Sequence, residues 1–404
     1  MPVDLKALPE KRALPQPPHA WRWCLIVLLC SLLVGALVVL LWPGDSWRLS
    51  PWFWCCALVL PLMSGLALYA LRRLIYERRC EYLDSWNQTH AEQEQVLIKK
   101  GQRAIALLAT SYCCGAGYNL IAQALLRGSK PLHPVYIKSK AQTLRLSQLE
   151  PSASLYTEDE YTQRLTTSLQ QVMRGLEPEM ERYRRNRPLC VRIRHNQVLG
   201  DEQVLSLWRS CRGSEQSADQ VVFATQDDGL LWLDTWLDEH EPDQLLLSLE
   251  FNLFLDPVAE HAESISAVLL AQPDRRAKQR LTPIAWVHRP VPMTEPAGGV
   301  LDALFWGQVA AENNEFFTWQ TQLPSELRAD VTVAMKAAGR SLDSARCHSL
   351  DGSLGLPGCA VGNMALIIAS ENAAIEGQAQ LLMLQDASPQ ACVIQPVCNA
   401  EGRD

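Results

Sequence analysis

The sequence predicts an α/β protein carried on two membrane-spanning helices. Two observations support this class: two long apolar stretches lie near the N-terminus, and the later residues alternate short apolar runs with amphipathic helical patterns. The apolar stretches are Trp21 to Trp42 and Trp52 to Leu71, separated by a short polar connector. We therefore expect a mixed-sheet, layered α/β domain attached to a transmembrane helical hairpin.

The first apolar stretch has the composition of a spanning helix. Between Cys24 and Leu41 nothing is more polar than Ser31, and roughly 20 apolar residues cross a ~30 Å hydrocarbon layer. A cleaved signal peptide is disfavoured because no small-residue cleavage site precedes Pro43 and a second apolar stretch follows at once. Indole side chains prefer the membrane interface, and they gather at the ends of both stretches, at Trp21, Trp23, Trp42, Trp47, Trp52 and Trp54.

The second apolar stretch contains Pro61, which removes one helical hydrogen bond, but membrane helices tolerate such a residue. Orientation is predicted by the basic residues, since cytoplasmic flanks are rich in Lys and Arg. Only Arg48 lies between the stretches, whereas the outer flanks carry Lys6, Lys11, Arg12, Arg22, Arg72, Arg73, Arg78 and Arg79. Both termini should therefore face the cytoplasm, with the juxtamembrane arginines against anionic lipid.

The remaining chain predicts a helical stalk and a globular domain. The stalk is polar with scattered apolar residues at helical spacing, and roughly 300 residues after it can bury a substantial core. The expected organisation is a cytoplasmic tail over 1–20, the hairpin over 21–75, the stalk over 76–100 and a cytoplasmic α/β domain over 101–404, with two lobes at 101–185 and 186–404.

Strands of this domain are predicted where short apolar runs occur, several of them continuous as in sheets covered on both faces. They lie at 104–108, 189–193, 221–223, 245–249, 266–270 and 391–394. A capping box at Thr157 to Glu160 opens a helix with an apolar stripe of Leu165, Leu169, Val172 and Leu176. Further helices are expected at 201–211, 229–239, 301–312, 327–338 and 360–376.

Composition excludes several classes of function. The 13 cysteines are an odd number without framework spacing, which fits a reducing compartment, and no Cys-x-x-Cys or Cys/His cluster has zinc spacing. We therefore predict no metal and no cofactor. The formal net charge of −7 gives no basic field for nucleic acid, so nucleic-acid binding is not expected.

Local motifs that could carry chemistry have simpler structural explanations. Cys347 and His348 are adjacent, so on a strand they point to opposite faces and do not form a dyad. The Gly-x-Gly element after Cys113-Cys114 lacks a third glycine and is read as a packed turn. Asp227-Asp228-Gly229 is interpreted as a helix cap and a loop in preference to a cation site. Trp232 and Trp236 are assigned to one helix face, and His195, His240, His261 and His288 are isolated in the sequence.

Residues 191–394 resemble the second half of ketosynthases and other thiolase-like domains. The segments that carry the resemblance are 245–250, 256–257, 264–270, 354–366, 380–384 and 392–394. A thiolase-like enzyme uses a Cys at the N-terminus of a buried helix, with two His or a His and an Asn. The helix start at Gly229 to Trp232 has no Cys, the loop at Ser353 to Gly358 has no His, and His348 is offset from it. The resemblance therefore implies the fold without the catalytic residues, and it also implies possible dimerisation.

The N-terminal third resembles accessory membrane proteins encoded beside bacterial type VI secretion systems, including those related to the type VI lipase adapters. The resemblance rests on the hairpin with its Trp-rich Pro-Gly connector and on the segments 71–77, 85–87 and 100–108. It implies a location in the bacterial inner membrane and a non-catalytic role in handling a secreted effector or spike component on the cytoplasmic side.

These patterns lead to two expectations about function. The first is a membrane-anchored, non-catalytic adapter that binds a type VI secretion effector or spike component. The alternative is a membrane-tethered acyltransferase or condensing enzyme acting on acyl thioesters, in which Cys211, Cys347 or Cys359 would occupy a helix N-terminus facing a His in a pocket. A transmembrane carrier is excluded because the two spans hold no charged residue at mid-depth.

Overall fold

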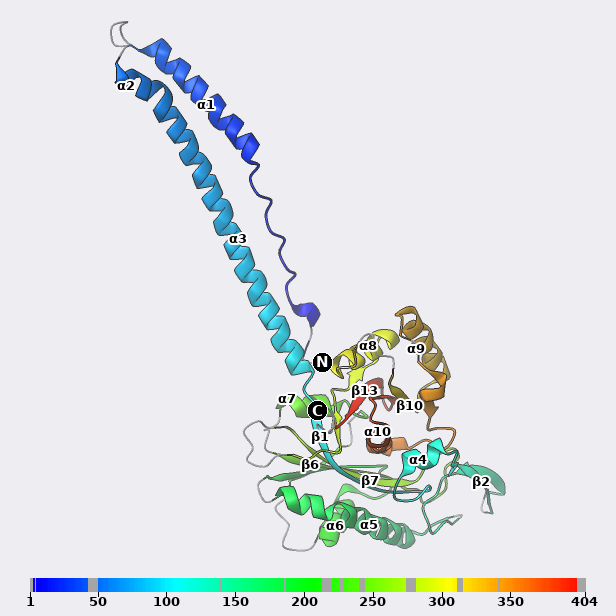
Figure 1. Cartoon of the computed structure of the whole chain (residues 1–404). Helices are drawn as coiled ribbons and strands as arrows, with labels where there is room; N and C mark the ends of the chain where they lie inside the picture. Colours follow the sequence, from blue (N-terminus) through cyan, green and yellow to red (C-terminus); the bar gives the residue numbers. More distant parts are fainter. Residues whose placement is uncertain are drawn as a thin grey trace, which may run out of the picture. The chain divides into compact units, whose positions relative to one another are not determined.

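The computed structural model describes residues 3, 5–42, 50–138, 140–153, 155–184, 187–212, 220–224, 228–239, 244–273, 281–310, 315–340 and 342–397. These residues form two compact units, Val3–Ile98 and Lys99–Asp404. Figure 1 shows the elements of both units.

The first unit is a helical hairpin. Helix α1 covers Ala20–Leu41, and a second continuous helix combines α2 (Pro51–Trp54), the π-helical turn η3 (Cys55–Val59) and α3 (Leu60–Gly101). Both helices are long and apolar enough to cross a membrane, by length and composition. The turn η3 ends two residues before Pro61, and such a π turn accommodates the N–H that proline lacks. The helix of the expected stalk is confirmed, because α3 continues without a break through those residues.

Small residues hold the two hairpin helices close together. A Cβ on Gly65 would lie 2.7 Å from Val27 Cγ1, and a Cβ on Gly35 would lie 2.9 Å from the Ala57 carbonyl oxygen. Only glycine permits this approach, as in packed membrane helices. The rings of Trp23 and Tyr69, 6.0 Å apart, continue the same contact toward the end of the apolar region.

The second unit is built on one mixed sheet with an internal repeat. The first half contributes β1 (Ile105–Cys114), β4 (Leu189–His195), β5 (Gln220–Phe223), β6 (Leu245–Asn252) and β7 (Ser264–Ala271). The second half contributes β8 (Ala285–Val287), β10 (Phe317–Thr321), β11 (Cys347–Ser349), β12 (Gln380–Gln385) and β13 (Pro389–Pro396). Both halves have the spatial order third, second, fourth, fifth, first. In both halves the third, second and fourth strands run parallel to one another. The fourth and fifth strands pair antiparallel, and so do the fifth and first.

The first strands of the two halves, β1 and β8, pair antiparallel and make the sheet continuous. The repeat therefore divides between β7 and β8, whereas the sequence suggested lobes at 101–185 and 186–404. A short strand, β9 (Val291–Pro292), pairs with β13, and a separate hairpin joins β2 (His133–Ile137) to β3 (Gln142–Leu146).

Helices cover both faces of the sheet (Figure 1). On one face lie α5 (Glu158–Arg184) and α6 (Asp201–Arg212), and on the other α4 (Ile121–Leu126), α7 (Trp232–Glu239) and α10 (Val361–Glu376). All eight residues of β6 and all eight of β7 are buried, as expected of strands covered on both faces. Helix α8 (Pro296–Trp306) packs on β13, where a Cβ on Gly307 would lie 2.4 Å from Val393 Cβ, and α9 (Ser325–Ala337) contacts α8.

The six predicted strands of the domain are confirmed, as is the capping box of α5. The Thr157 amide donates to Glu160 Oε2 at 2.8 Å, and the Glu160 amide donates to Thr157 Oγ1 at 3.3 Å. Two helix predictions had wrong bounds. Helix α7 begins at Trp232 instead of residue 229, and α8 covers Pro296–Trp306 instead of 301–312. Pro296 fits the first turn of a helix, and Gly307, which follows the last residue of α8, lies against Val393 of β13.

Candidate functional site at the junction of the two halves

The two buried helices α7 and α10 begin beside each other at the junction of the repeated halves. Each follows the third strand of its own half, and glycines permit the approach of the two helix starts. A Cβ on Gly362 would lie 3.1 Å from the Gly229 carbonyl oxygen and 3.2 Å from Glu250 Oε1. Gly229 itself has φ 49°, a left-handed conformation that favours glycine.

The start of α10 holds a buried carboxylate. Glu250, on β6, is fully buried, and its Oε2 accepts the Asn363 amide at 2.8 Å. Arg192 Nη1 donates to Glu250 Oε1 at 2.9 Å and to Ser248 Oγ at 2.9 Å. The Arg192 guanidinium also lies 4.2 Å from the centroid of the Trp232 ring. A negative charge at a helix N-terminus is stabilised by the free amides and the helix dipole, so Glu250 is held by charge and by hydrogen bonds.

The segment leading into α7 holds a second carboxylate. The Gly229 amide donates to Asp386 Oδ2 at 2.8 Å, and the Leu230 amide donates to Gln390 Oε1 at 2.6 Å. Arg194 forms an ion pair with Asp386. Asp228 faces the same hairpin, where its Oδ1 accepts the Ala387 amide at 3.0 Å. The amides at this helix start are therefore already hydrogen-bonded to side chains of the chain itself.

Each half of the domain supplies one carboxylate to the helix start of the other half. Glu250 belongs to the fourth strand of the first half and binds the central helix of the second half. Asp386 follows the fourth strand of the second half and binds the segment before the central helix of the first half. Their partners Arg192 and Arg194 are two residues apart on β4, so they lie on the same face of the sheet.

Sequence reasoning missed this arrangement of Arg192, Arg194, Glu250 and Asp386. A signal was present for three of them, because a charged side chain inside an apolar strand needs a partner when it is buried. Arg192 and Arg194 alternate with apolar residues in β4, and Glu250 extends the apolar run of β6. The partners themselves depend on which strands become neighbours, and β4 pairs with β6 only in the folded sheet.

Cys359 is the candidate thiol that lies closest to a helix start. It occupies the 3-10 turn η6 (Gly358–Ala360) directly before α10. Its Sγ donates to the Phe251 carbonyl oxygen at 3.3 Å and lies 3.6 Å from Asn252 Oδ1. Burial, and after it the charge of Glu250, raise the pKa of the Cys359 thiol to about 12. A thiol in this environment is protonated at neutral pH, in contrast to an activated nucleophile.

Alkylation of Cys359 should therefore be slow in the native protein. A neutral-pH reagent reacts with thiolate, and a group with a pKa of about 12 holds very little thiolate at pH 7. We expect the native labelling rate of Cys359 to rise about tenfold per pH unit between pH 7 and 9, and labelling at pH 7 to become fast in denaturant. Mass spectrometry of alkylated peptides measures both, with Cys359→Ser as the control. Fast native labelling at pH 7 would contradict this assignment.

The other two candidate thiols lie apart from the helix starts. Cys347 is on β11, where burial raises its pKa, while the His348 ring stacks on Phe317 with centroids 5.2 Å apart. Cys211 lies near the end of α6, and burial raises its pKa as well. Neither residue lies at a helix N-terminus, which the alternative enzymatic function required.

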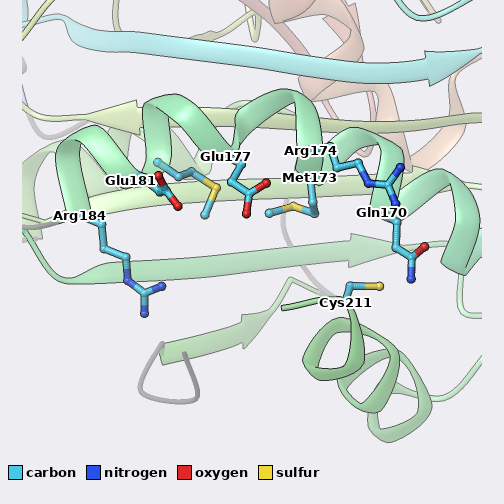
Figure 2. A pocket seen from close by; sticks show the side chains of 8 residues that line it. Gln170, Met173, Arg174, Glu177, Glu181, Arg184 and Cys211 are labelled. Carbon is cyan, nitrogen blue, oxygen red and sulfur yellow. The ribbon is translucent and has the colours of Figure 1, made fainter. Parts of the chain in front are cut away.

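Cys211 instead lines a pocket beside α5 (Figure 2). The pocket has a volume of about 320 Å³ and is lined by Gln170, Met173, Arg174, Glu177, Met180, Glu181, Arg184 and Cys211. Seven of these eight residues belong to α5. Figure 2 shows the Cys211 thiol opposite the α5 side chains, with Glu177 and Glu181 on one helix face. The mixture of charges and thioethers indicates no particular reaction.

The remaining motifs have structural roles. Cys113 and Cys114 are buried in β1, and the turn after them is closed, since the Gly117 amide donates to the Cys114 carbonyl at 2.9 Å. Asp227 lies outside the described residues, whereas Asp228 binds the β12–β13 hairpin. Among the described residues, no group of three His, Cys, Asp or Glu side chains could hold a metal ion.

The histidines and tryptophans singled out in the sequence do not form one site. His195 Nε2 lies 2.9 Å from Asp201 Oδ1, and burial lowers the pKa of His288 to about 4. The His261 Nδ1 lies 2.9 Å from the Ala259 carbonyl oxygen. His240 lies outside the described residues. Of the two tryptophans on α7, Trp236 is buried, and Trp232 is half-buried against Arg192.

Comparison with solved structures shows a thiolase-like fold. The ketosynthase from module 1 of the bacillaene synthase from Bacillus amyloliquefaciens FZB42 has 10% sequence identity and a TM-score of 0.50, with 74% of this chain and 76% of that chain covered. The ketosynthase from module 6 of the bacillaene synthase from Bacillus subtilis 168 has 9% identity and a TM-score of 0.51, with 72% and 70% covered. No protein-family model and no curated protein sequence matches this chain. The similarity concerns the fold alone.

Proposed function

We propose that this chain, whose larger unit has a thiolase-like fold, is a membrane-anchored adapter that binds a protein partner without catalysing a reaction. The observation that carries the proposal is the occupation of both helix starts. Glu250 accepts the Asn363 amide in the first turn of α10, while Asp386 and Gln390 accept the Gly229 and Leu230 amides before α7. In a thiolase-like enzyme a nucleophilic Cys would be expected at such a helix start. Internal carboxylates there compete with any substrate anion.

The partner we propose is a type VI secretion effector or spike component on the cytoplasmic side. This part rests on the resemblance of the hairpin and of the segments up to residue 108 to accessory proteins of that system. The alternative, an acyltransferase, draws on one observation, the position of Cys359 directly before α10. The raised pKa of its thiol argues against a nucleophile, so we prefer the adapter.

The test of the adapter is affinity capture of the full-length protein in detergent, followed by mass spectrometry. We expect a lipase-like effector or a spike protein to co-purify in excess over a capture with an unrelated two-span membrane protein. Purified candidate and bait should then bind each other directly, and Cys359→Ser should leave this binding unchanged. Enrichment of acyl carrier protein, lost in Cys359→Ser, would overturn the adapter in favour of the enzyme.

We further propose an inner-membrane location with both termini in the cytoplasm. The distribution of Lys and Arg supports it, and so does a contact between the two flanks of the hairpin. Lys11 Nζ lies 3.2 Å from Glu94 Oε2, and the Arg12 amide donates to Asn87 Oδ1 at 3.0 Å. Residues before the first apolar helix and residues after the second can meet only on one side of a membrane.

A topology reporter should distinguish the two orientations. Alkaline phosphatase, which is active only outside the cytoplasm, should be inactive when fused after Asp404 and active when inserted in the connector between Trp42 and Ser50. Activity of the C-terminal fusion, with an inactive connector insertion, would contradict the proposed orientation. Immunoblotting for equal amounts of the fusions controls for expression.

A further inference from the structure

A proline-rich segment precedes the first apolar helix. Residues 8–19 contain Pro9, Pro15, Pro17 and Pro18, and they belong to no helix or strand. Figure 1 shows them as an extended trace between the short turn at Leu5–Ala7 and α1. Closely spaced prolines favour the polyproline II helix, which repeats every three residues and has no internal hydrogen bonds. The segment is therefore extended without support from a neighbouring strand.

Two edges of this segment carry prolines and the third carries none. We define the proline segment as residues 12–18, and its three-residue repeat divides it into three edges. The first edge is Arg12, Pro15 and Pro18, the second is Leu14 and Pro17, and the third is Ala13 and Gln16. Such a chain can place the first two edges in a groove and keep the third in water. Proline-rich ligands of this kind bind grooves lined by aromatic side chains.

A rigid spacer would account for the prolines but not for their neighbours. A spacer needs only an extended chain, so the residues between its prolines are unconstrained. Here an apolar residue precedes each proline of the first edge, with Leu14 before Pro15 and Pro17 before Pro18. Arg12 stands at one end, where a guanidinium can pair with carboxylates at the rim of a groove and fix the direction of the bound chain. The order of residue types is therefore that of a directional ligand.

The stalk helix α3 holds the basic end of the proline segment. The Arg12 guanidinium lies 4.4 Å from the centroid of the Trp86 ring, and Lys11 Nζ lies 3.2 Å from Glu94 Oε2. Asn87 accepts the Arg12 amide at 3.0 Å and donates to the Arg12 carbonyl at 2.9 Å. One aromatic ring, one carboxylate and one amide of the chain itself therefore bind this end.

The second edge of the proline segment is left open. Leu14 is 54% exposed, and Pro17 on the same edge is exposed as well, whereas Pro15 and Pro18 are half-buried. Apolar side chains that stand in water on one edge of an extended chain gain free energy when a groove covers them. The stalk therefore contacts the basic end and leaves the second edge available to a partner.

We infer that the proline segment is a docking site for a partner protein whose groove is lined by aromatic side chains and bordered by acidic ones. The aromatic side chains cover both proline-bearing edges, and the acidic rim pairs with Arg12. The partner displaces the stalk from Arg12, which costs little because those contacts are exposed. The inference does not rest on the proposed secretion role, because a purified groove tests it without any effector.

The experiment measures binding of the full-length protein in detergent to an isolated SH3 domain that accepts ligands with a basic residue at the N-terminal end. The groove of this domain has the stated chemistry. The domain carries a fluorophore, and its anisotropy gives the dissociation constant. We expect saturable binding that weakens about tenfold in Pro15→Ala and in Pro18→Ala, because each loses a ring that fills the groove. Gln16→Ala is the matched control and should change the constant by less than about twofold, since Gln16 lies on the edge away from the groove.

Release from the stalk provides a second readout. Asn87→Ala removes both hydrogen bonds to the Arg12 backbone and leaves the proline segment unchanged, so it should strengthen binding about threefold. Absence of binding in the parent and in Asn87→Ala, or equal affinities for the parent and Pro15→Ala, would overturn the inference. So would a loss in Gln16→Ala as large as the loss in Pro15→Ala, since binding would then not distinguish the edges.

Discussion

Substitution of Glu250 by Gln is expected to lower the free energy of unfolding of the thiolase-like unit by about 3–5 kcal/mol, because it breaks the buried ion pair with Arg192. Arg192 and Glu250 are both buried, and the hydrogen bond between them is 2.9 Å long. Glu250 also accepts the Asn363 amide at the start of α10, and a neutral amide oxygen is a weaker acceptor there.

The measurement is urea unfolding of the full-length protein in a non-ionic detergent, followed by circular dichroism. Glu260→Gln is the matched control, since the Arg145–Glu260 pair is 3.6 Å long and half-exposed. An exposed pair contributes about 0–1 kcal/mol, so the control should be almost neutral. Equal losses for Glu250→Gln and Glu260→Gln would show that the buried contacts of Glu250 contribute no more to stability than an exposed ion pair. A double-mutant cycle should show strong coupling. In the Arg192→Met background, Glu250→Gln should cost much less stability, because the ion pair with Arg192 is already absent.

Substitution of Trp319 by Ala is expected to cost about 3–5 kcal/mol, since it leaves a large cavity in the second half. Trp319 lies on β10, is 1% exposed and packs against Phe317 with ring centroids 5.0 Å apart. Its Nε1 donates to Gln380 Oε1 at 3.0 Å, and Asn372 Nδ2 donates to the same oxygen at 2.9 Å. The indole therefore links β10, β12 and α10.

The same unfolding experiment measures this effect. Trp319→Phe should cost less than Trp319→Ala, because the ring still fills part of the site and only the N–H donor is lost. Val333→Ala on α9 is the surface control, with Val333 70% exposed and a change within about 0.5 kcal/mol expected. Equal losses for Trp319→Phe and Trp319→Ala would show that the hydrogen bond, and not the packing, carries the contribution.

Local sequence pattern was sufficient for most elements and insufficient for a few. Strands β6 and β7 were predictable because every residue in them is buried, which requires a continuous apolar run. The capping box predicted the start of α5 because both hydrogen bonds lie within four residues. Strands β2, β3, β8, β9, β10 and β11 were missed, since each has at most five residues, and pairing with neighbours supplies their stability.

The sequence by itself determined the two apolar helices, the α/β class and the absence of a cysteine at the start of α7. Each of these is a property of consecutive residues: hydrophobic length, periodicity or the identity of one side chain. Only the tertiary structure decided the internal repeat and the exchange of Glu250 and Asp386 between its halves. Glu250 and Asn363 are 113 residues apart, and Gly229 and Asp386 are 157 apart. Such pairs depend on which strands become neighbours in the sheet, and burial then requires each charge to find a partner.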